Sequence, residues 1–124
     1  MIPQISEAEL EVMKVLWERE SAASLQIIEA LRETTEWKSK TIQTLITRLV
    51  SKGAVIADKS NPKMFLYRAA VSKEQYRLGE NQSFLHRVYD GSIKMMLASF
   101  VQGQILTDDE RAELKALLEK EEES

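Results

Sequence analysis

The chain has 124 residues, 44% hydrophobic and 30% charged, with a net charge of −3, a balance typical of one soluble domain or of a small domain with an appendage. With no cysteine and a single histidine, the sequence excludes disulfides and thiolate metal sites and disfavours His-rich catalytic or zinc sites, so we expect no metal, no cofactor and no enzyme. No apolar run reaches the roughly 18 residues of a membrane span and the start shows no signal peptide, which together predict a cytoplasmic protein without membrane insertion.

The first part of the chain predicts three helices. Ser6 and Glu9 form a capping box at the start of a helix over residues 6–19. A short second helix begins at Ser21 or Ser24 and carries apolar residues up to Leu31. The third segment is the most regular, and Gly53 is its expected left-handed terminator. Its apolar stripe, at i, i+3, i+4, i+7 and i+8, comprises Ile42, Leu45, Ile46, Leu49 and Val50.

After Gly53 the pattern changes to that of strands. Residues 55–59 and 64–68 are short runs of β-branched and aromatic side chains, and residues 60–63 between them have turn chemistry, which predicts a hairpin. A capping box at residues 72–75 opens a further helix that Gly91 ends. A short helix follows over residues 92–101, and a third capping box at residues 107–110 begins the last one.

Three helices followed by a hairpin is the element order of a winged helix-turn-helix. We therefore predict a mainly α fold with a small β-hairpin. Residues 1–71 form a winged-helix DNA-binding domain in this interpretation, and residues 72–124 form a C-terminal helical dimerisation region.

The charges separate along the chain in a way that the net charge hides. Residues 1–37 carry a net charge of −5 and residues 69–124 a net charge of −4, whereas residues 38–68 carry seven basic side chains against Asp58 alone. A basic block between acidic flanks is the pattern expected of a polyanion site. The alternative is a chance clustering of solvated surface charge.

The third helix has the side chains of a DNA recognition helix. Opposite its apolar stripe it presents basic and short polar groups, with no Asp or Glu between Lys38 and Lys52. Glutamine can pair with adenine, arginine with guanine, and a threonine methyl with thymine. The candidate DNA-binding residues are Lys38, Lys40, Thr41, Gln43, Thr44, Thr47 and Arg48 on the helix, and Lys59, Lys63 and Arg68 on the hairpin, where a wing meets phosphates. The alternative from another functional class is a winged-helix module that binds a protein partner. Such a module would not need a helix face without Asp and Glu.

The region from Ser72 onward is too apolar to be fully solvated and too short to form its own core. A second copy of the chain would cover it and give a twofold dimer suited to a palindromic operator. The expected interface residues are Phe84, Leu85, Val88, Tyr89, Ile93, Leu97, Phe100, Leu114, Leu117 and Leu118. The alternative is that these helices fold back on the first domain. His86 is isolated, and we expect a packed or surface side chain there rather than a metal ligand.

Three blocks of sequence, Ile5–Trp17, Lys40–Leu49 and Phe84–Gly91, resemble the penicillinase repressor (BlaI/MecI) family, and the resemblance extends from about Ile5 to Leu118. It implies a bacterial homodimeric repressor of β-lactamase or related resistance genes, bound to operators with a TACA/TGTA-type dyad. It also implies that Lys40, Thr41, Gln43, Thr44 and Arg48 occupy recognition-helix positions, with the hairpin Lys59–Arg68 as the wing.

The resemblance further implies how repression ends. In the family a membrane metalloprotease sensor, activated by β-lactam, leads to cleavage of the repressor within its dimerisation helices. The family's bond is Asn-Phe in a Leu-x-Asn-Phe context, and the corresponding stretch here is Leu97–Phe100, with Ser99 in place of asparagine. Cleavage between Ser99 and Phe100 is therefore the expected release step. Release by a small ligand is the alternative.

Overall fold

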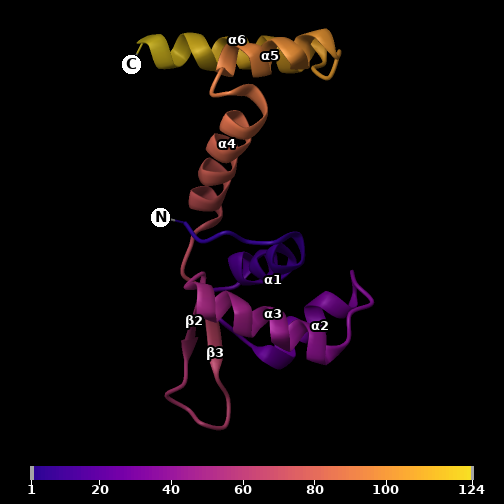
Figure 1. Ribbon diagram of the computed structural model, residues 1–124, viewed down its shortest axis with the longest axis vertical. Helices are drawn as coiled ribbons and strands as arrows, with labels where there is room; N and C mark the ends of the chain where they lie inside the picture. Colours follow the sequence, from indigo (N-terminus) through magenta and orange to yellow (C-terminus); the bar gives the residue numbers. More distant parts are fainter. Residues whose placement is uncertain (1, 124) are drawn as a thin grey trace. The chain divides into compact units, whose positions relative to one another are not determined.

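The structure is a computed structural model that describes the backbone of residues 2–123 and the side chains of residues 2–120. The chain divides into two compact units, Met1–Gly79 and Glu80–Ser124, called here the first and second units. Helix α4 (Lys73–Tyr89) begins in the first unit and continues into the second. The helices and strands are labelled in Figure 1.

Local signals explain where the helices of the first unit begin and end. α1 (Glu7–Glu18) has Ser6 as its N-cap, and the Ser6 hydroxyl accepts the N–H of Glu9 while the Glu9 carboxylate accepts the N–H of Ser6. α2 (Ser24–Arg32) starts at the second of the two expected serines, but its N-cap is Ala23. α3 (Ser39–Lys52) ends at Gly53, whose φ of 81° lies in the left-handed region that favours glycine, which confirms the expected terminator.

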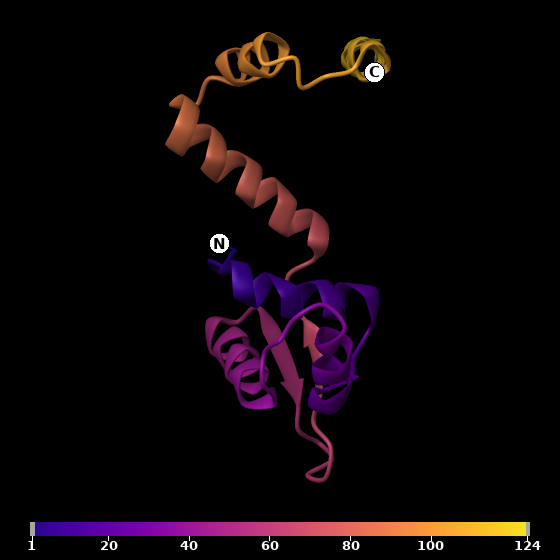
Figure 2. The same cartoon turned by 90° about the vertical axis from the view of Figure 1, so that its right-hand side faces the viewer.

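A three-stranded antiparallel sheet in the order β1-β3-β2 completes the first unit. β2 (Val55–Asp58) and β3 (Leu66–Ala69) form the predicted hairpin, shifted by one or two residues at the strand ends, with Val55 opposite Ala69. In both Figure 1 and Figure 2 the loop between β2 and β3 projects beyond the three helices of this unit.

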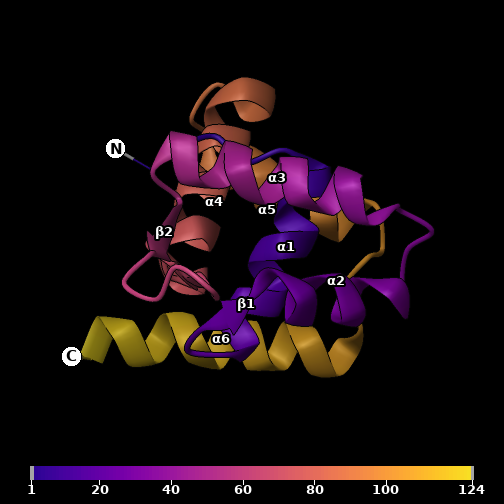
Figure 3. The same ribbon diagram turned by 90° about the horizontal axis from the view of Figure 1, so that it is seen from below.

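The remaining strand, β1 (Ala22–Ala23), was not expected from the sequence. Ala22 pairs with Tyr67 of β3, and Figure 3 shows β1 leading directly into α2. A strand of two alanines has neither alternation nor β-branched side chains, so it carries no signal of its own. Its pairing with β3 makes the predicted two-stranded hairpin a three-stranded sheet.

One apolar core lies between α1, α2, α3 and the sheet. Each large apolar side chain that it buries stabilises the fold by roughly 1.5–3 kcal/mol. The fully buried members include Val12, Met13, Ile27, Ile42, Ile46 and Leu49. Those on α3 belong to the predicted stripe, so the opposite face of α3 remains exposed to solvent.

The second unit consists of helices without a buried core. α5 (Ile93–Gln102) and α6 (Asp108–Glu123) follow the end of α4, and none of the side chains described in this unit is buried. The Ser92 hydroxyl caps α5 by accepting the N–H of Met95, and Thr107 forms the expected capping box with Glu110. Gly91, with φ of 86°, follows the end of α4 as predicted.

The predicted fold class is confirmed, because the chain is mainly helical with a small antiparallel sheet in winged-helix order. The division into a DNA-binding domain (1–71) and a dimerisation region (72–124) is a statement about function and stays a prediction. Within residues 2–123, no helix combines the length and apolar character needed to cross a membrane.

Candidate nucleic-acid interface

The exposed face of α3 presents the side chains that were predicted from the sequence to bind DNA. Lys38, at the N-cap, Lys40, Thr41, Thr44, Thr47 and Arg48 are exposed, and Gln43 is half-buried. The buried residues of α3 are all on the apolar stripe, and the described helix contains no acidic side chain. The result is a polar and basic surface without carboxylates that would repel phosphates.

Two threonine hydroxyls on this face donate hydrogen bonds to backbone carbonyls of the same helix. Thr44 donates to the carbonyl oxygen of Lys40 and Thr47 to that of Gln43, each at 3.0 Å. Because each hydroxyl proton is used within the helix, these threonines offer oxygen lone pairs and methyl groups to an incoming partner. Such groups accept from base amino groups and contact thymine methyls.

The loop between β2 and β3 is ordered by its own side chains. The Asp58 carboxylate accepts the N–H of Ser60 at 3.0 Å, and the Asn61 side chain accepts the N–H of Lys63 at 3.0 Å. The hydrogen bonds from Ser60 hold the pKa of Asp58 below its ordinary value. Asp58, the acidic residue of the basic block, therefore serves as a hydrogen-bond acceptor within the turn.

The cations of the hairpin are exposed. Lys59, Lys63 and Arg68 lie on the surface of the first unit, and the Lys59 ammonium lies over the ring of Phe65, 5.6 Å from its centroid. Cations on a projecting loop next to a carboxylate-free helix face form a surface that can contact phosphates.

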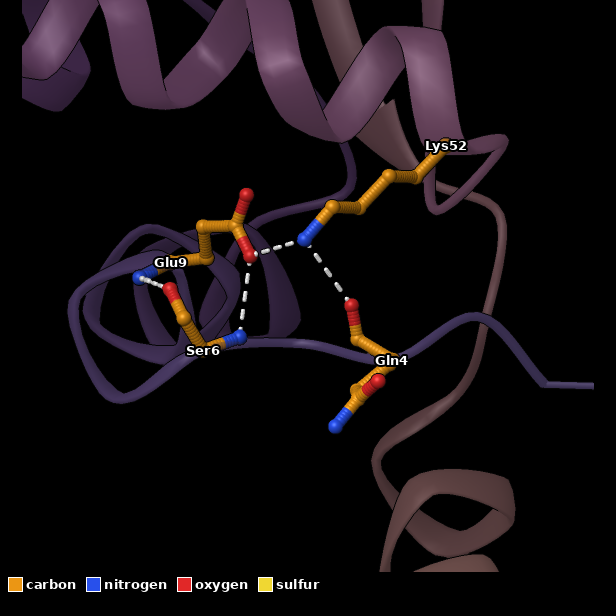
Figure 4. Close-up of polar contacts among 4 residues, drawn as sticks. All are labelled: Gln4, Ser6, Glu9 and Lys52. Atoms are coloured by element: carbon orange, nitrogen blue, oxygen red, sulfur yellow. Dashed lines mark hydrogen bonds and ion pairs between the residues drawn. The ribbon is translucent and has the colours of Figure 1, made fainter.

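Lys52 belongs to the basic block in sequence but is engaged elsewhere. Its Nζ is 2.5 Å from Oε1 of Glu9 and 3.0 Å from the carbonyl oxygen of Gln4, as Figure 4 shows. Six of the seven basic side chains of residues 38–68 therefore remain for an external polyanion. A charge count along the sequence cannot separate this cation from the others.

A groove of about 560 Å³ lies beside the exposed face of α3. Gln43 lines it together with the start of α2 and the residues before β3. Its apolar residues, Leu25, Met64 and Phe65, are exposed. Their pattern in the sequence predicted a helix and a strand but no binding site. Leu25 lies at the start of α2, and Met64 and Phe65 precede β3, so only the fold brings them to one groove.

The apolar residues expected at a dimer interface lie in the second unit and keep contact with solvent. Phe84, Val88, Ile93, Leu117 and Leu118 are exposed, whereas Leu85, Tyr89, Leu97, Phe100 and Leu114 are half-buried. The rings of Phe84 and Tyr89 pack edge to face, with centroids 5.8 Å apart. The unit therefore presents a large apolar surface that its own helices do not cover.

The expected cleavage position lies inside α5. The Ser99 hydroxyl donates to the carbonyl oxygen of Met96 at 2.7 Å and is 2.8 Å from the Tyr89 hydroxyl. The Ser99–Phe100 bond is thus held in a helix that is fastened to the end of α4. Because a protease binds extended backbone, it could cut this bond only after α5 opens locally.

His86 is exposed on α4 and lies near Gly91, where an added Cβ would be 3.6 Å from the imidazole. Among the residues that the structure describes, no cluster of histidine and carboxylate side chains has the composition of a metal site.

Comparison with known proteins gives a consistent result. The family model described as penicillinase repressor matches residues 5–120. The penicillinase repressor of Bacillus licheniformis is 40% identical over 96% of this chain and 92% of its own length. The methicillin resistance regulatory protein MecI of Staphylococcus aureus is 37% identical over 94% of each chain.

A solved structure resembles the first part of the chain. The monomeric form of BlaI of Bacillus licheniformis, in complex with the blaP half-operator, is similar with a TM-score of 0.54 and 43% identity. The similarity covers 61% of this chain and 92% of that one. Since the family model and the relatives both extend over nearly the whole sequence, the chain belongs to the penicillinase repressor family.

Proposed function

We propose that this protein is a homodimeric transcriptional repressor that binds a palindromic operator of β-lactamase or related resistance genes. The observation that carries the proposal is the carboxylate-free, exposed face of α3 beside a hairpin loop with exposed cations. A helix of this kind fits the major groove, and the loop cations neutralise adjacent phosphates.

The residues divide into two roles in this proposal. Gln43 and Arg48 read base edges, since their side chains form paired hydrogen bonds with adenine and guanine, and Thr41, Thr44 and Thr47 add methyl and oxygen contacts. Lys38, Lys40, Lys59, Lys63 and Arg68 contact phosphates and set the position of the domain on the duplex.

The relatives support this assignment. Among them are a penicillinase repressor and a methicillin resistance regulatory protein, and the BlaI structure was solved with a half-operator. A half-operator suits one copy of a winged helix, so two copies suit a full palindrome. By this analogy the operator carries a TACA/TGTA-type dyad, and a protein that binds it is expected in the cytoplasm.

Dimerisation is assigned to the apolar surface of the second unit. Phe84, Val88, Ile93, Leu117 and Leu118 leave apolar area in water at an energetic cost of roughly 25 cal/mol per Å². A second copy that covers the same residues removes this cost and links two DNA-binding domains. The second half-site is then bound at high effective concentration, so the dimer binds far more tightly than a monomer.

Release is assigned to cleavage between Ser99 and Phe100 by a protease in a pathway with a membrane metalloprotease sensor. This cut separates the last residues of α5 and all of α6, including Leu114, Leu117 and Leu118, from the rest of the chain. The dimer surface loses part of its apolar area, and each remaining DNA-binding domain binds a half-site alone.

The test is binding of the full chain to a palindromic TACA/TGTA duplex and to a scrambled duplex, titrated over salt. We expect two chains per operator, a clear preference for the operator and a steep loss of affinity as salt rises. Weak binding that ignores sequence would contradict the proposal and would favour a protein-interaction module. If the protein prefers the operator but is not released from it by cleavage, release by a ligand would be favoured.

A further inference from the structure

Another hollow of the first unit, called here the α1–α4 pocket, has a volume of about 380 Å³ and lies between α1 and the first turns of α4. Such a volume is within the range of small-molecule sites, roughly 300–1,000 Å³. All of its lining precedes residue 80, so the pocket belongs to the first unit alone. The lining consists of Leu10, Lys14, Trp17, Glu18, Lys73, Tyr76 and Arg77.

Two aromatic rings form the apolar part of the pocket. The ring centroids of Trp17 and Tyr76 are 5.6 Å apart, and the ring planes are tilted by 42°. The Trp17 indole Nε1 donates to the carbonyl oxygen of Val71 at 2.8 Å, just before α4 begins. Both rings are half-buried, so each keeps some surface in contact with solvent. The pocket therefore offers an apolar surface whose indole is already held in position.

The cations of the pocket are Lys14 from α1 and Lys73 and Arg77 from α4, and all of them are exposed. Lys73 and Arg77 are four residues apart, so they share one face of α4 and repel each other. Among the described side chains, neither forms an ion pair with a carboxylate, and Lys14 pairs only with Glu11, 3.8 Å away and exposed to water. Against these three cations the lining contributes the carboxylate of Glu18, which leaves it a net charge of +2.

We infer that the α1–α4 pocket binds a small aromatic carboxylate. In this inference the ring of the ligand packs against Trp17 and Tyr76, and Lys73 and Arg77 hold its carboxylate. The bound anion neutralises the repulsion between the two cations of α4, and the guanidinium of Arg77 can pair with both carboxylate oxygens. The ligand ring removes apolar surface of the two aromatic side chains from water. The inference goes beyond the proposed function and does not rest on it.

The charge around the pocket distinguishes between classes of ligand. Residues 1–37 carry a net charge of −5 and residues 69–124 a net charge of −4, so a polyanion that extended beyond the pocket would meet like charge. The cations of the lining repel a cationic ligand, although aromatic rings alone would accept one. A neutral apolar ligand would leave the repulsion between Lys73 and Arg77 in place. A compact anion with an aromatic body meets each of these conditions.

A ligand in this pocket contacts α1 and the start of α4 together. It therefore strengthens the packing between these two helices, which the Trp17–Tyr76 pair already joins. Because α4 continues into the second unit, the ligand acts on the helix that connects the proposed DNA-binding and dimerisation regions.

The test is a heteronuclear NMR titration of the full chain with hydrocinnamate, a phenyl ring on a propanoate chain, without DNA. The chain has two tryptophans, Trp17 in the pocket and Trp37 outside it. The indole N–H signal of Trp17 reports on the site, that of Trp37 is an internal control, and the variant Trp37→Phe assigns the two. We expect the Trp17 signal to shift with a dissociation constant on the order of 1 mM, and the Trp37 signal to stay in place.

Two related compounds separate the contributions of charge and ring. Hydrocinnamide keeps the ring without the charge, and propanoate keeps the carboxylate without the ring. Each should bind about tenfold more weakly than hydrocinnamate.

A pair of variants tests the cations. Lys73→Gln/Arg77→Gln should weaken hydrocinnamate binding about tenfold. Lys59→Gln/Lys63→Gln, the matched control, removes two exposed positive charges from the same unit outside the pocket and should leave the affinity unchanged. Circular dichroism and thermal unfolding establish that both variants are folded, as expected for substitutions of exposed side chains.

Four results would overturn the inference. A Trp17 signal that does not respond to hydrocinnamate would show that the pocket is closed to small ligands, as it would be if a second copy of the chain covered it. Equal binding of hydrocinnamide would leave the cations without a role, and equal binding of propanoate would indicate an anion held by exposed charges alone. Wild-type affinity in Lys73→Gln/Arg77→Gln would place the carboxylate elsewhere. Because the titration contains no DNA, each of these results leaves the proposed repressor function unaffected.

Discussion

The carboxylate of Glu9 lies 2.5 Å from Nζ of Lys52, which joins the first turn of α1 to the last turn of α3. The Glu9 side chain is 2% exposed, whereas that of Lys52 is 37% exposed. Lys52 also donates to the carbonyl oxygen of Gln4, and Glu9 accepts the N–H of Ser6 (Figure 4). One buried carboxylate thus positions the end of the proposed recognition helix against the start of α1.

Lys52→Met should lower the free energy of unfolding by about 2 kcal/mol, because it leaves a buried carboxylate without its cation. The effect is smaller than for a fully buried pair since Lys52 is partly exposed. Lys14→Met is the matched control. Lys14 and Glu11 are 3.8 Å apart and both exposed to water, so that pair contributes less than about 0.5 kcal/mol. Urea unfolding measures both, and equal effects would contradict the role of Lys52.

Glu9 should also make stability depend on pH. Burial raises the pKa of its carboxyl, but hydrogen bonds from Lys52 and Ser6 and the charge of Lys52 lower it by more, so the pKa lies below its ordinary value of 4.5. Because the pKa is lower in the folded than in the unfolded state, the ionised carboxylate stabilises the fold at pH values above the ordinary pKa of 4.5. That stabilisation is lost as pH falls through the folded-state pKa.

Glu9→Gln removes this ionisation while keeping the shape of the side chain. The difference in unfolding free energy between wild type and Glu9→Gln should therefore be largest near neutral pH, at about 1–2 kcal/mol. It should shrink as the pH falls below 4.5. Urea unfolding of both proteins across this pH range measures the difference. Asp58 and Glu110, whose pKa values are also lowered, are present in both proteins, so their contributions to the pH dependence cancel. A difference that does not change with pH would contradict the prediction.

The sequence predicted those features that depend on neighbours along the chain. The Ser6–Glu9 capping box, the apolar stripe of α3 and the Gly53 terminator each need only a few adjacent residues. Features that depend on distant partners were not predicted. Glu9 was recognised as a capping residue, but its partner Lys52 is 43 residues away and was counted only as one charge of the basic block.

The same distinction applies to the sheet and the groove. β1 exists because β3 offers a partner strand to Ala22 and Ala23, whose own side chains give no sign of a strand. Leu25 and Met64 line one groove only because the hairpin returns beside α2. The exposed face of α3, proposed here to bind DNA, could be identified from the sequence because all of its residues lie on one helix.

Arg48→Ala should weaken operator binding by roughly 1–3 kcal/mol if Arg48 reads a base, with little change in binding to scrambled DNA. Arg48 is exposed on α3, so its truncation leaves the core intact. Fluorescence anisotropy with both duplexes measures the two affinities. Arg32→Ala, at the exposed end of α2, is the control for loss of one positive charge. Equal losses on both duplexes would reassign Arg48 to a phosphate contact.

Leu117→Asp should convert the proposed dimer to monomers, because it places a charge within the proposed apolar interface of the second unit. Leu117 is 60% exposed within one copy, so the substitution does not disturb folding of the monomer. Leu25→Asp, at a side chain 61% exposed in the first unit, is the matched control and should remain dimeric. Sedimentation without DNA distinguishes the two, and a dimeric Leu117→Asp would remove α6 from the interface.

Tyr89→Phe should speed cleavage between Ser99 and Phe100. The Tyr89 hydroxyl is 2.8 Å from that of Ser99 and fastens α5 to the end of α4. Its removal costs about 1 kcal/mol, which raises the population of locally opened α5 about fivefold. Limited proteolysis with thermolysin, which cuts before large apolar residues, followed by mass spectrometry, measures this bond directly when opening is fast relative to cleavage.

Ser83→Ala is the control for this experiment. It removes a serine hydroxyl from α4 in the same unit, where Arg87 donates to it across an exposed helix turn at 3.3 Å. Because that contact does not join α4 to α5, cleavage should keep the wild-type rate. A common rate for wild type, Tyr89→Phe and Ser83→Ala would show that the hydroxyl pair does not limit opening of α5. A protease would then reach Ser99–Phe100 through a motion that leaves this pair intact.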